Sequence, residues 1–315
     1  MGKGKWWLAG ALAGGLVASA AVRRHYRVQR QRRLNQDVQV LVLGAGVIGC
    51  AYAVQLARWG MDVTLVARGR RLEELAVRGV SVRDVLTRRQ LAGPVLLTGQ
   101  VPSREYDLVL VAVQFPEVGQ ALEAVKPLAE TSPVLVLQNN PVGAEPLLQV
   151  LEGPSILMGF PGTGGVRWQG EVYHLPFWLG ETVLGESNGS RTHRLQLAAA
   201  ILRRAGLTVR LQRRMVPWLQ SHAAMIAVLA GCILRNGGQL QRFARDIAEV
   251  QHYFSALNEA FALLEGAGIP VVPRSLRAHS QPLWRQTLLT SLASFLPGVN
   301  FIVEGYLRDK LPEFR

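Results

Sequence analysis

The sequence predicts an α/β fold in which a doubly wound parallel sheet is followed by an all-α C-terminal domain. Three observations support this prediction. A nearly continuous apolar run over 38–43 leads into a glycine-rich loop and then a helical segment. Short apolar runs then alternate with helical segments as far as about residue 190. Beyond that point apolar residues recur at steps of three and four, the period of a helix.

The composition is that of a globular protein. Of the 315 residues, 49% are hydrophobic and 18% are charged, which excludes a disordered chain and allows about two domains with cores of their own. Cys50 and Cys232 form neither a disulfide framework nor a metal-binding spacing, which favours a reducing compartment. We expect three parts: a basic tail over 1–37, a sheet domain over 38–190 and a helical domain over 191–315.

Most of the net charge of +13 lies in the tail, because residues 1–35 hold eight lysines and arginines and no acid. The rest of the chain has 27 basic against 22 acidic residues, so a nucleic-acid-binding domain is not indicated.

Residues 6–22 form an uncharged stretch which, as a helix, is about 25 Å long, the short end of what spans a bilayer. Six arginines follow over 23–33 and would keep the rest of the chain in the cytoplasm. The tail therefore predicts a membrane anchor. Three alternatives stay open: a signal peptide cleaved after 18–20, a disordered extension, or a start codon upstream of the true one.

The glycine-rich loop has the spacing GxGxxG. The first glycine permits a tight turn, the second lets the backbone approach a pyrophosphate, and the third lets the helix pack closely on the strand. The start of the following helix offers free N–H groups to phosphates. A second β-branched run at 62–66 completes a βαβ unit. We therefore predict a Rossmann-like domain, or a Rossmann half that has lost its nucleotide. The predicted dinucleotide-binding residues are Gly44, Ala45, Gly46, Val47, Ile48 and Gly49.

The end of the second strand helps to choose the cofactor. NAD-binding proteins usually carry Asp or Glu there to bind the ribose 2′-OH. This chain has Ala67-Arg68-Gly69-Arg70-Arg71 and no carboxylate. Arg68, with Arg70 or Arg71, could bind a 2′-phosphate through charge-assisted hydrogen bonds, which favours NADP over NAD. The alternative is a solvated basic turn.

Apolar runs at 106–113 and 133–137 predict two further buried strands. Ligands of such sheets bind beyond the carboxyl ends of the strands. Gln114 and Asn139 follow these two ends, so we expect them to line the cofactor site unless they are ordinary loop residues. A glycine-rich bend at 159–165 either lets the backbone approach the nicotinamide end of the cofactor or is simply a wide turn.

The helical half contains three long apolar segments. The first, 215–234, is interrupted by Gln220, Ser221 and His222, which indicates a core helix facing a cleft rather than a second membrane span. An apolar stripe follows over 247–264. A third stretch, 284–307, is broken at Pro297-Gly298. A substrate would lie between the sheet and the helices, and two chains could pair through the helices.

Four segments from about residue 38 onward carry a resemblance to a known family. They are VQVLVLGAGVIGCAYAVQLARWGMDVTLVARGRR at 38–71, YDLVLVAV at 106–113, LVLQNN at 135–140 and NEAFALLEGAGIP at 258–270. On these segments the sequence resembles the ketopantoate reductase (2-dehydropantoate 2-reductase) family. The resemblance implies reduction of a 2-oxo acid to a 2-hydroxy acid with NADPH, in a cleft between two domains. It places Arg68 at the 2′-phosphate and Asn139 at the asparagine of the family's QNG motif.

Two lysines that the resemblance implies are missing. The lysine that follows the strand at 106–113 in the family aligns with Gln114. The catalytic lysine, two positions after a tryptophan that starts a helix, falls on Gln220 when counted from Trp218. No lysine lies between Lys126 and Lys310, so a shifted alignment does not restore it. A neutral amide cannot deliver a proton to a developing alkoxide.

His222 is the best substitute for the catalytic lysine. It follows Trp218 by one helical turn, and an imidazole titrates near neutrality. The alternative is an ordinary core histidine. We predict an NADPH-dependent reductase of a small 2-oxo acid or related carbonyl compound, an oxidoreductase acting on CH–OH donors. The competing prediction is a non-catalytic NADP-binding sensor or scaffold that has lost its proton donor.

Overall fold

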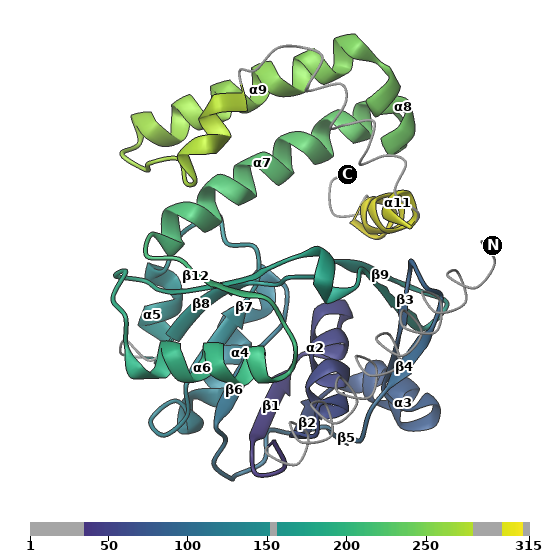
Figure 1. Ribbon diagram of the computed structural model, residues 1–315, viewed down its shortest axis with the longest axis vertical. Helices are drawn as coiled ribbons and strands as arrows, with labels where there is room; N and C mark the ends of the chain where they lie inside the picture. Colours follow the sequence, from purple (N-terminus) through teal and green to yellow (C-terminus); the bar gives the residue numbers. More distant parts are fainter. Residues whose placement is uncertain (1–34, 152–155, 280–297, 311–315) are drawn as a thin grey trace, which may run out of the picture.

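A computed structural model of the protein describes residues 35–151, 156–279 and 298–310. The predicted anchor at 6–22 and most of the helical stretch at 284–307 lie outside these residues. The sheet domain occupies the lower part of Figure 1, and the long helices lie above it.

The larger sheet has eight strands in the order β12-β11-β8-β7-β6-β1-β2-β5. All neighbouring strands are parallel except β8 and β11, so the doubly wound parallel sheet is confirmed. Three central strands, β1, β6 and β7, are almost wholly buried, as their continuous apolar runs require. The strands are β1 (Gln39–Leu43), β2 (Asp62–Val66), β5 (Val95–Thr98), β6 (Leu108–Val111), β7 (Val134–Leu137), β8 (Ile156–Phe160), β11 (Thr182–Glu186) and β12 (Val209–Leu211).

Helices cover both faces of this sheet. Successive side chains of β1 point to opposite faces and contact different helices. Val40 and Val42 share a core with α2 (Val47–Arg58) and α6 (His193–Arg204). Leu41 and Leu43 point the other way, into a core with α4 (Val118–Val125), α5 (Glu145–Leu151) and the start of α7. The remaining connections include α3 (Gly69–Arg78) and the 3₁₀ turns Phe115–Glu117, Lys126–Leu128, Phe177–Leu179 and Arg274–His279.

A second, four-stranded sheet was not predicted. Its order is β4-β3-β10-β9, and Val82 and Val172 in it share a core with α2. Because α2 lies between the two sheets, its residues are buried nearly all round, from Gly49 to Ala57. The strands are β3 (Ser81–Asp84), β4 (Gln90–Ala92), β9 (Gly165–Trp168) and β10 (Glu171–His174).

The helical part begins later than residue 190. Helix α6 still covers the large sheet, and β12 adds its last strand, so the chain leaves the sheet only at α7 (Met215–Arg235). A three-residue edge strand is too short to give a signal in the sequence. The other helices are α8 (Leu240–Arg245), α9 (Ile247–Gly266) and α11 (Val299–Lys310).

Helix α7 connects the two parts of the molecule (Figure 1). Met215, Trp218 and Leu219 pack on the sheet, while its later turns contact α9. By length and composition, α7 alone among the helices of the described residues could cross a bilayer. The stripe predicted from 247 covers α9, but its first residue, Ile247, is 53% exposed because it stands at the helix end.

Candidate functional site

The glycine-rich loop between β1 and α2 has a backbone that only glycine allows at two positions. Gly44 has a φ of +106°, and a Cβ on it would lie 2.5 Å from the carbonyl oxygen of Ala112. A Cβ on Gly49 would lie 1.7 Å from the carbonyl oxygen of Gly44. The helix therefore begins directly against the loop, as a tight strand-to-helix turn needs.

Gly46 is different, because the space around it is open. It is the N-cap of α2, and no atom lies within 4 Å of the place where its Cβ would be. It provides no side-chain cap, and the first turn of α2 carries no acidic residue. The first N–H groups of the helix thus have neither an intrahelical partner nor a capping oxygen, which leaves them available to an anion. This geometry fits the pyrophosphate of a dinucleotide.

The three arginines after β2 have different environments. Arg68 is the exposed N-cap of α3, and its side chain makes no hydrogen bond or ion pair among the described residues. The Arg70 side chain is 91% exposed and pairs with Glu74 at 3.4 Å. The Arg71 side chain is only 13% exposed, and its Nε–H donates to the carbonyl oxygen of Ala45 at 3.0 Å. Arg71 therefore supports the glycine loop, while Arg68 and Arg70 face solvent.

At the end of β7, Asn139 is exposed and Asn140 is buried. Asn140 closes a turn: its Oδ1 accepts the N–H groups of Val142 and Gly143, each at 3.0 Å, and its Nδ2 donates to the carbonyl oxygen of Gly143 at 2.7 Å. The asparagine that stands where the family motif has glycine is therefore structural. Gln114, after β6, is exposed and is the N-cap of a 3₁₀ turn.

The sequence analysis missed Gln138. It is 7% exposed, and neither its Oε1 nor its Nε2 has a hydrogen-bond partner within the described residues. Its backbone N–H donates to the carbonyl oxygen of Gly159 at 3.2 Å, which places Gln138 beside Phe160. The period of two along β7 could have found it, because Gln138 continues the row of Val134 and Val136 that faces α7.

Above these strand ends, His222 lies among aromatic rings of α7 and β8. Its ring centroid is 4.1 Å from that of Phe160 and 5.3 Å from that of Trp218, with which it stacks. Its Nδ1 is buried and has no partner within the described residues. Burial lowers the pKa of His222 to about 4. The expectation that it titrates near neutrality is therefore wrong: at pH 7 it is neutral and is not an imidazolium acid.

The glycine-rich bend at 159–165 owes two of its glycines to close packing of the backbone. A Cβ on Gly165 would lie 2.1 Å from the carbonyl oxygen of Tyr173 and 2.7 Å from a methyl group of Val47. A Cβ on Gly162 would lie 2.7 Å from the backbone nitrogen of Thr182. The bend thus lets β9 pass directly against the first residue of α2, and it is more than a wide turn.

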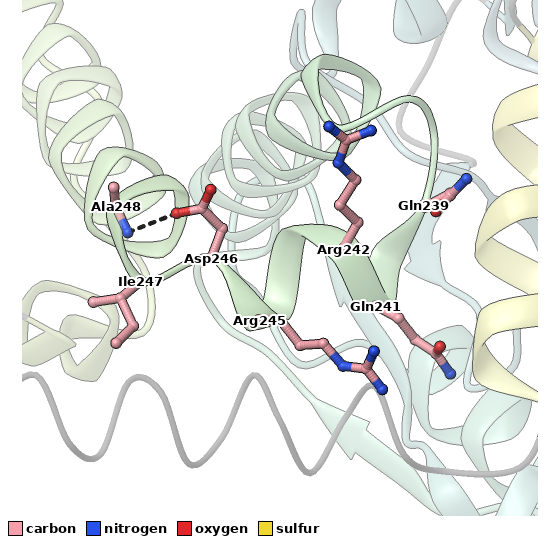
Figure 2. A pocket seen from close by; sticks show the side chains of 7 residues that line it. All are labelled: Gln239, Gln241, Arg242, Arg245, Asp246, Ile247 and Ala248. Carbon is pink, nitrogen blue, oxygen red and sulfur yellow. Dashed lines mark hydrogen bonds between the residues drawn. The ribbon is translucent and has the colours of Figure 1, made fainter.

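A hollow of about 670 Å³ lies elsewhere, between α8 and the start of α9, and it does not have the features of a site. Figure 2 shows that the side chains of Arg242 and Arg245 point in different directions, so they do not converge on one ligand. The start of α9 is already capped, because the Asp246 carboxylate accepts the N–H of Ala248 at 3.0 Å.

The part of the chain that contains the glycine-rich loop is similar to known proteins. A sequence model of the family described as ketopantoate reductase PanE/ApbA matches residues 40–189. Residues 40–189, the larger part of the sheet domain, belong to the ketopantoate reductase family. A 2-dehydropantoate 2-reductase of Pyrococcus horikoshii is 28% identical over 186 residues, which are 58% of this chain and 58% of that protein. The match thus spans less than two thirds of the relative's length. Members of this family are NAD(P)-dependent oxidoreductases acting on small molecules.

Solved structures extend the likeness of fold over both parts of the chain. The 2-dehydropantoate 2-reductase of Porphyromonas gingivalis W83 is 20% identical, with a TM-score of 0.64 over 89% of this chain and 97% of that one. D-Mandelate dehydrogenase, solved with NADH and anilino(oxo)acetate, is 14% identical, with a TM-score of 0.68 over 88% of this chain and 86% of that one. At these identities the likeness concerns the fold alone.

Gln220 is the residue that the resemblance places at the family's catalytic lysine. Its Nε2 donates to the carbonyl oxygen of Pro141 at 3.4 Å. The amide therefore ties α7 to the turn that Asn140 closes. Next to it, the Ser221 hydroxyl accepts the N–H of Val272 at 3.0 Å and donates to the carbonyl oxygen of Pro217 at 2.7 Å. Two of the three polar residues that interrupt the apolar helix, Gln220 and Ser221, thus hold neighbouring segments in place.

Proposed function

We propose that the protein is an NADPH-dependent reductase of a small 2-oxo acid or related carbonyl compound. The observation that carries this proposal is the open N-terminus of α2 at Gly46 with the exposed Arg68 at the end of the neighbouring strand. The helix start would bind the pyrophosphate, and the guanidinium would bind the 2′-phosphate that distinguishes NADP from NAD. Gln114 and Asn139 would line the same edge of the sheet. When bound, NADPH supplies a hydride.

In this proposal the substrate lies at the carboxyl ends of β7 and β8, under α7. Phe160 and Trp218, whose rings are in contact, would form apolar walls beside the substrate. His222, neutral at pH 7, offers one N–H hydrogen bond to the carbonyl oxygen rather than a transferable proton, a role that neutral imidazoles have in other enzymes. The alkoxide proton then comes from solvent.

A second candidate function, a non-catalytic NADP-binding sensor or scaffold, is favoured by one observation. The position of the catalytic lysine is occupied by Gln220, whose amide is engaged with Pro141, and the nearest histidine has a pKa of about 4. Neither group is an acid at pH 7.

One experiment separates these functions. NADPH and NADH are titrated against the purified protein, and NADPH oxidation is then followed across a panel of 2-oxo acids and ketones. Turnover of any of them supports the reductase, whereas tight NADPH binding without turnover supports the sensor. The absence of any pyridine nucleotide binding contradicts both.

A matched pair of variants tests the place of binding. Gly46→Asp puts an acid into open space at the start of α2 and should abolish nucleotide binding without unfolding the protein. Gly119→Asp, which also enters open space but in α4, should leave binding unchanged.

For the cellular setting, we propose that the reductase lies in the cytoplasm and is tethered to a membrane through residues 6–22. We also propose that two chains pair through the helical part. Support for the tether comes from the arginines at 23–33, and support for the pairing comes from the helical sequence pattern beyond residue 191.

A further inference from the structure

Two buried polar side chains without partners lie at one place, where the end of β7 meets α7. Gln138 extends the row of β7 that faces α7, next to Phe160 on β8. His222 of α7 lies against that same phenylalanine ring. The amide of Gln138 and the Nδ1 of His222 have no hydrogen-bond partner within the described residues. A buried polar group without a partner destabilises the fold, so a pair of them at strand ends indicates a place where a ligand supplies the missing bonds.

The side chains gathered at this place carry no charge at pH 7. Gln138, Phe160 and Trp218 have none, and Gln220 stands where the family has a lysine. His222 is neutral there because burial lowers its pKa. The guanidinium of Arg210 contacts the Trp218 ring, 5.7 Å from its centroid, but it is already paired with Glu181 at 2.9 Å. Among the described residues, Arg210 is the cation that contacts the Trp218 ring, and its charge is already compensated by Glu181.

A carboxylate buried without a cation pays a large desolvation cost, whereas a ketone or ester needs only hydrogen-bond donors. We propose that Gln138 and His222 bind the polar groups of an uncharged carbonyl substrate, and that the enzyme prefers such a compound to a 2-oxo acid. The amide of Gln138 both donates and accepts, so it can take a second oxygen of the substrate beside its ketone. The aromatic walls of Phe160 and Trp218 fit an apolar or aromatic substituent. This inference rests on the proposed function and narrows its substrate class.

The test compares two probes that share the phenyl ketone and differ at the carboxyl group: phenylglyoxylate, which is an anion, and its uncharged methyl ester. Each is added to the NADPH-loaded protein, and both Tm and the rate of NADPH oxidation are measured. We expect the ester to raise Tm by about 3 °C when in tenfold excess over its Kd, and its kcat/KM to exceed that of the acid at least tenfold. An acid that binds or reacts as well as the ester overturns the inference, and so does a Tm that neither compound changes.

Substitutions at Gln138 locate the effect. Gln138→Leu should lower kcat/KM for the ester about tenfold, the loss of one hydrogen bond, while the Kd of NADPH stays within twofold. Gln138→Lys should move the preference towards the acid. Gln196→Leu, at an exposed position of α6, is the matched control and should change nothing. Unaltered ester turnover in Gln138→Leu overturns the role of Gln138. If NADPH itself fails to raise Tm, it is the proposed function that fails.

Discussion

The Nε–H of Arg71 donates a hydrogen bond to the carbonyl oxygen of Ala45 over 3.0 Å. This bond connects the first turn of α3 to the glycine loop, and the same guanidinium also contacts Glu74 and the carbonyl oxygen of Gly170. Of the arginines after β2, Arg71 thus holds the loop, whereas Arg68 is exposed to solvent.

Arg68→Asp should therefore weaken NADPH binding far more than NADH binding. Losing a charge-assisted bond and adding a repulsive carboxylate should raise the Kd of NADPH roughly 10- to 100-fold. The Kd of NADH, which lacks the 2′-phosphate, should change less than threefold. Fluorescence titration measures both. Equal effects on the two cofactors would remove Arg68 from the phosphate site, and Arg191→Asp, at another exposed arginine, is the control.

Arg71→Ala should behave differently. Since Arg71 holds the loop rather than the 2′-phosphate, its loss should weaken NADH and NADPH binding by similar factors. It should also lower the free energy of unfolding by about 1–2 kcal/mol, measured in urea. A loss confined to NADPH would show that Arg71 reaches the phosphate after all.

Tyr52→Phe should destabilise the sheet domain by about 1–3 kcal/mol. The Tyr52 hydroxyl is buried, forms a 2.6 Å hydrogen bond with the hydroxyl of Thr182 and accepts the N–H of Gly162 at 3.1 Å. Its loss leaves two buried groups unpaired. Urea unfolding measures the change. Tyr173→Phe removes a hydroxyl that donates to the half-exposed Glu171 carboxylate and should cost under about 1 kcal/mol. A smaller effect at Tyr52 than at Tyr173 would contradict this account.

The lowered pKa of His222 predicts a loss of stability in acid. Unfolded, the imidazole is protonated below its ordinary pKa of 6.5; folded, it resists protonation down to about 4. Its contribution is therefore complete above pH 6.5 and is lost as the pH falls towards 4. Between pH 7.5 and 4.5, the free energy of unfolding should fall by about 2 kcal/mol more in the wild type than in His222→Gln. If the free energy of unfolding changes with pH by the same amount in both proteins, the imidazole of His222 is accessible to solvent and the prediction is contradicted.

The tail makes a separate prediction about location. A full-length fusion should sediment with membranes, and removal of residues 1–35 should move it to the soluble fraction, because the apolar stretch and its arginines are then gone. Western blotting of fractionated cells measures the distribution. A full-length protein already in the soluble fraction contradicts the anchor.

The sequence by itself determined the βαβ unit, the glycine loop and the order of sheet and helices, because these depend on local periodicity and on where glycine is required. Its apolar runs also located the buried strands to within one or two residues at most ends. The small sheet was missed, because its four short strands lie in two segments about 70 residues apart and pair only through tertiary contact.

Only the tertiary structure decided which polar side chains at the site already have hydrogen-bond partners within the protein and which do not. The sequence alone does not distinguish Arg68, Arg70 and Arg71. In the structure only Arg71, among these three, donates a hydrogen bond to the glycine loop. Gln138 is an ordinary strand-end residue until α7 covers it, and His222 would titrate near neutrality if two aromatic rings did not bury it. Burial and hydrogen-bond partners set the charge and availability of a side chain, and both come from segments distant in the sequence.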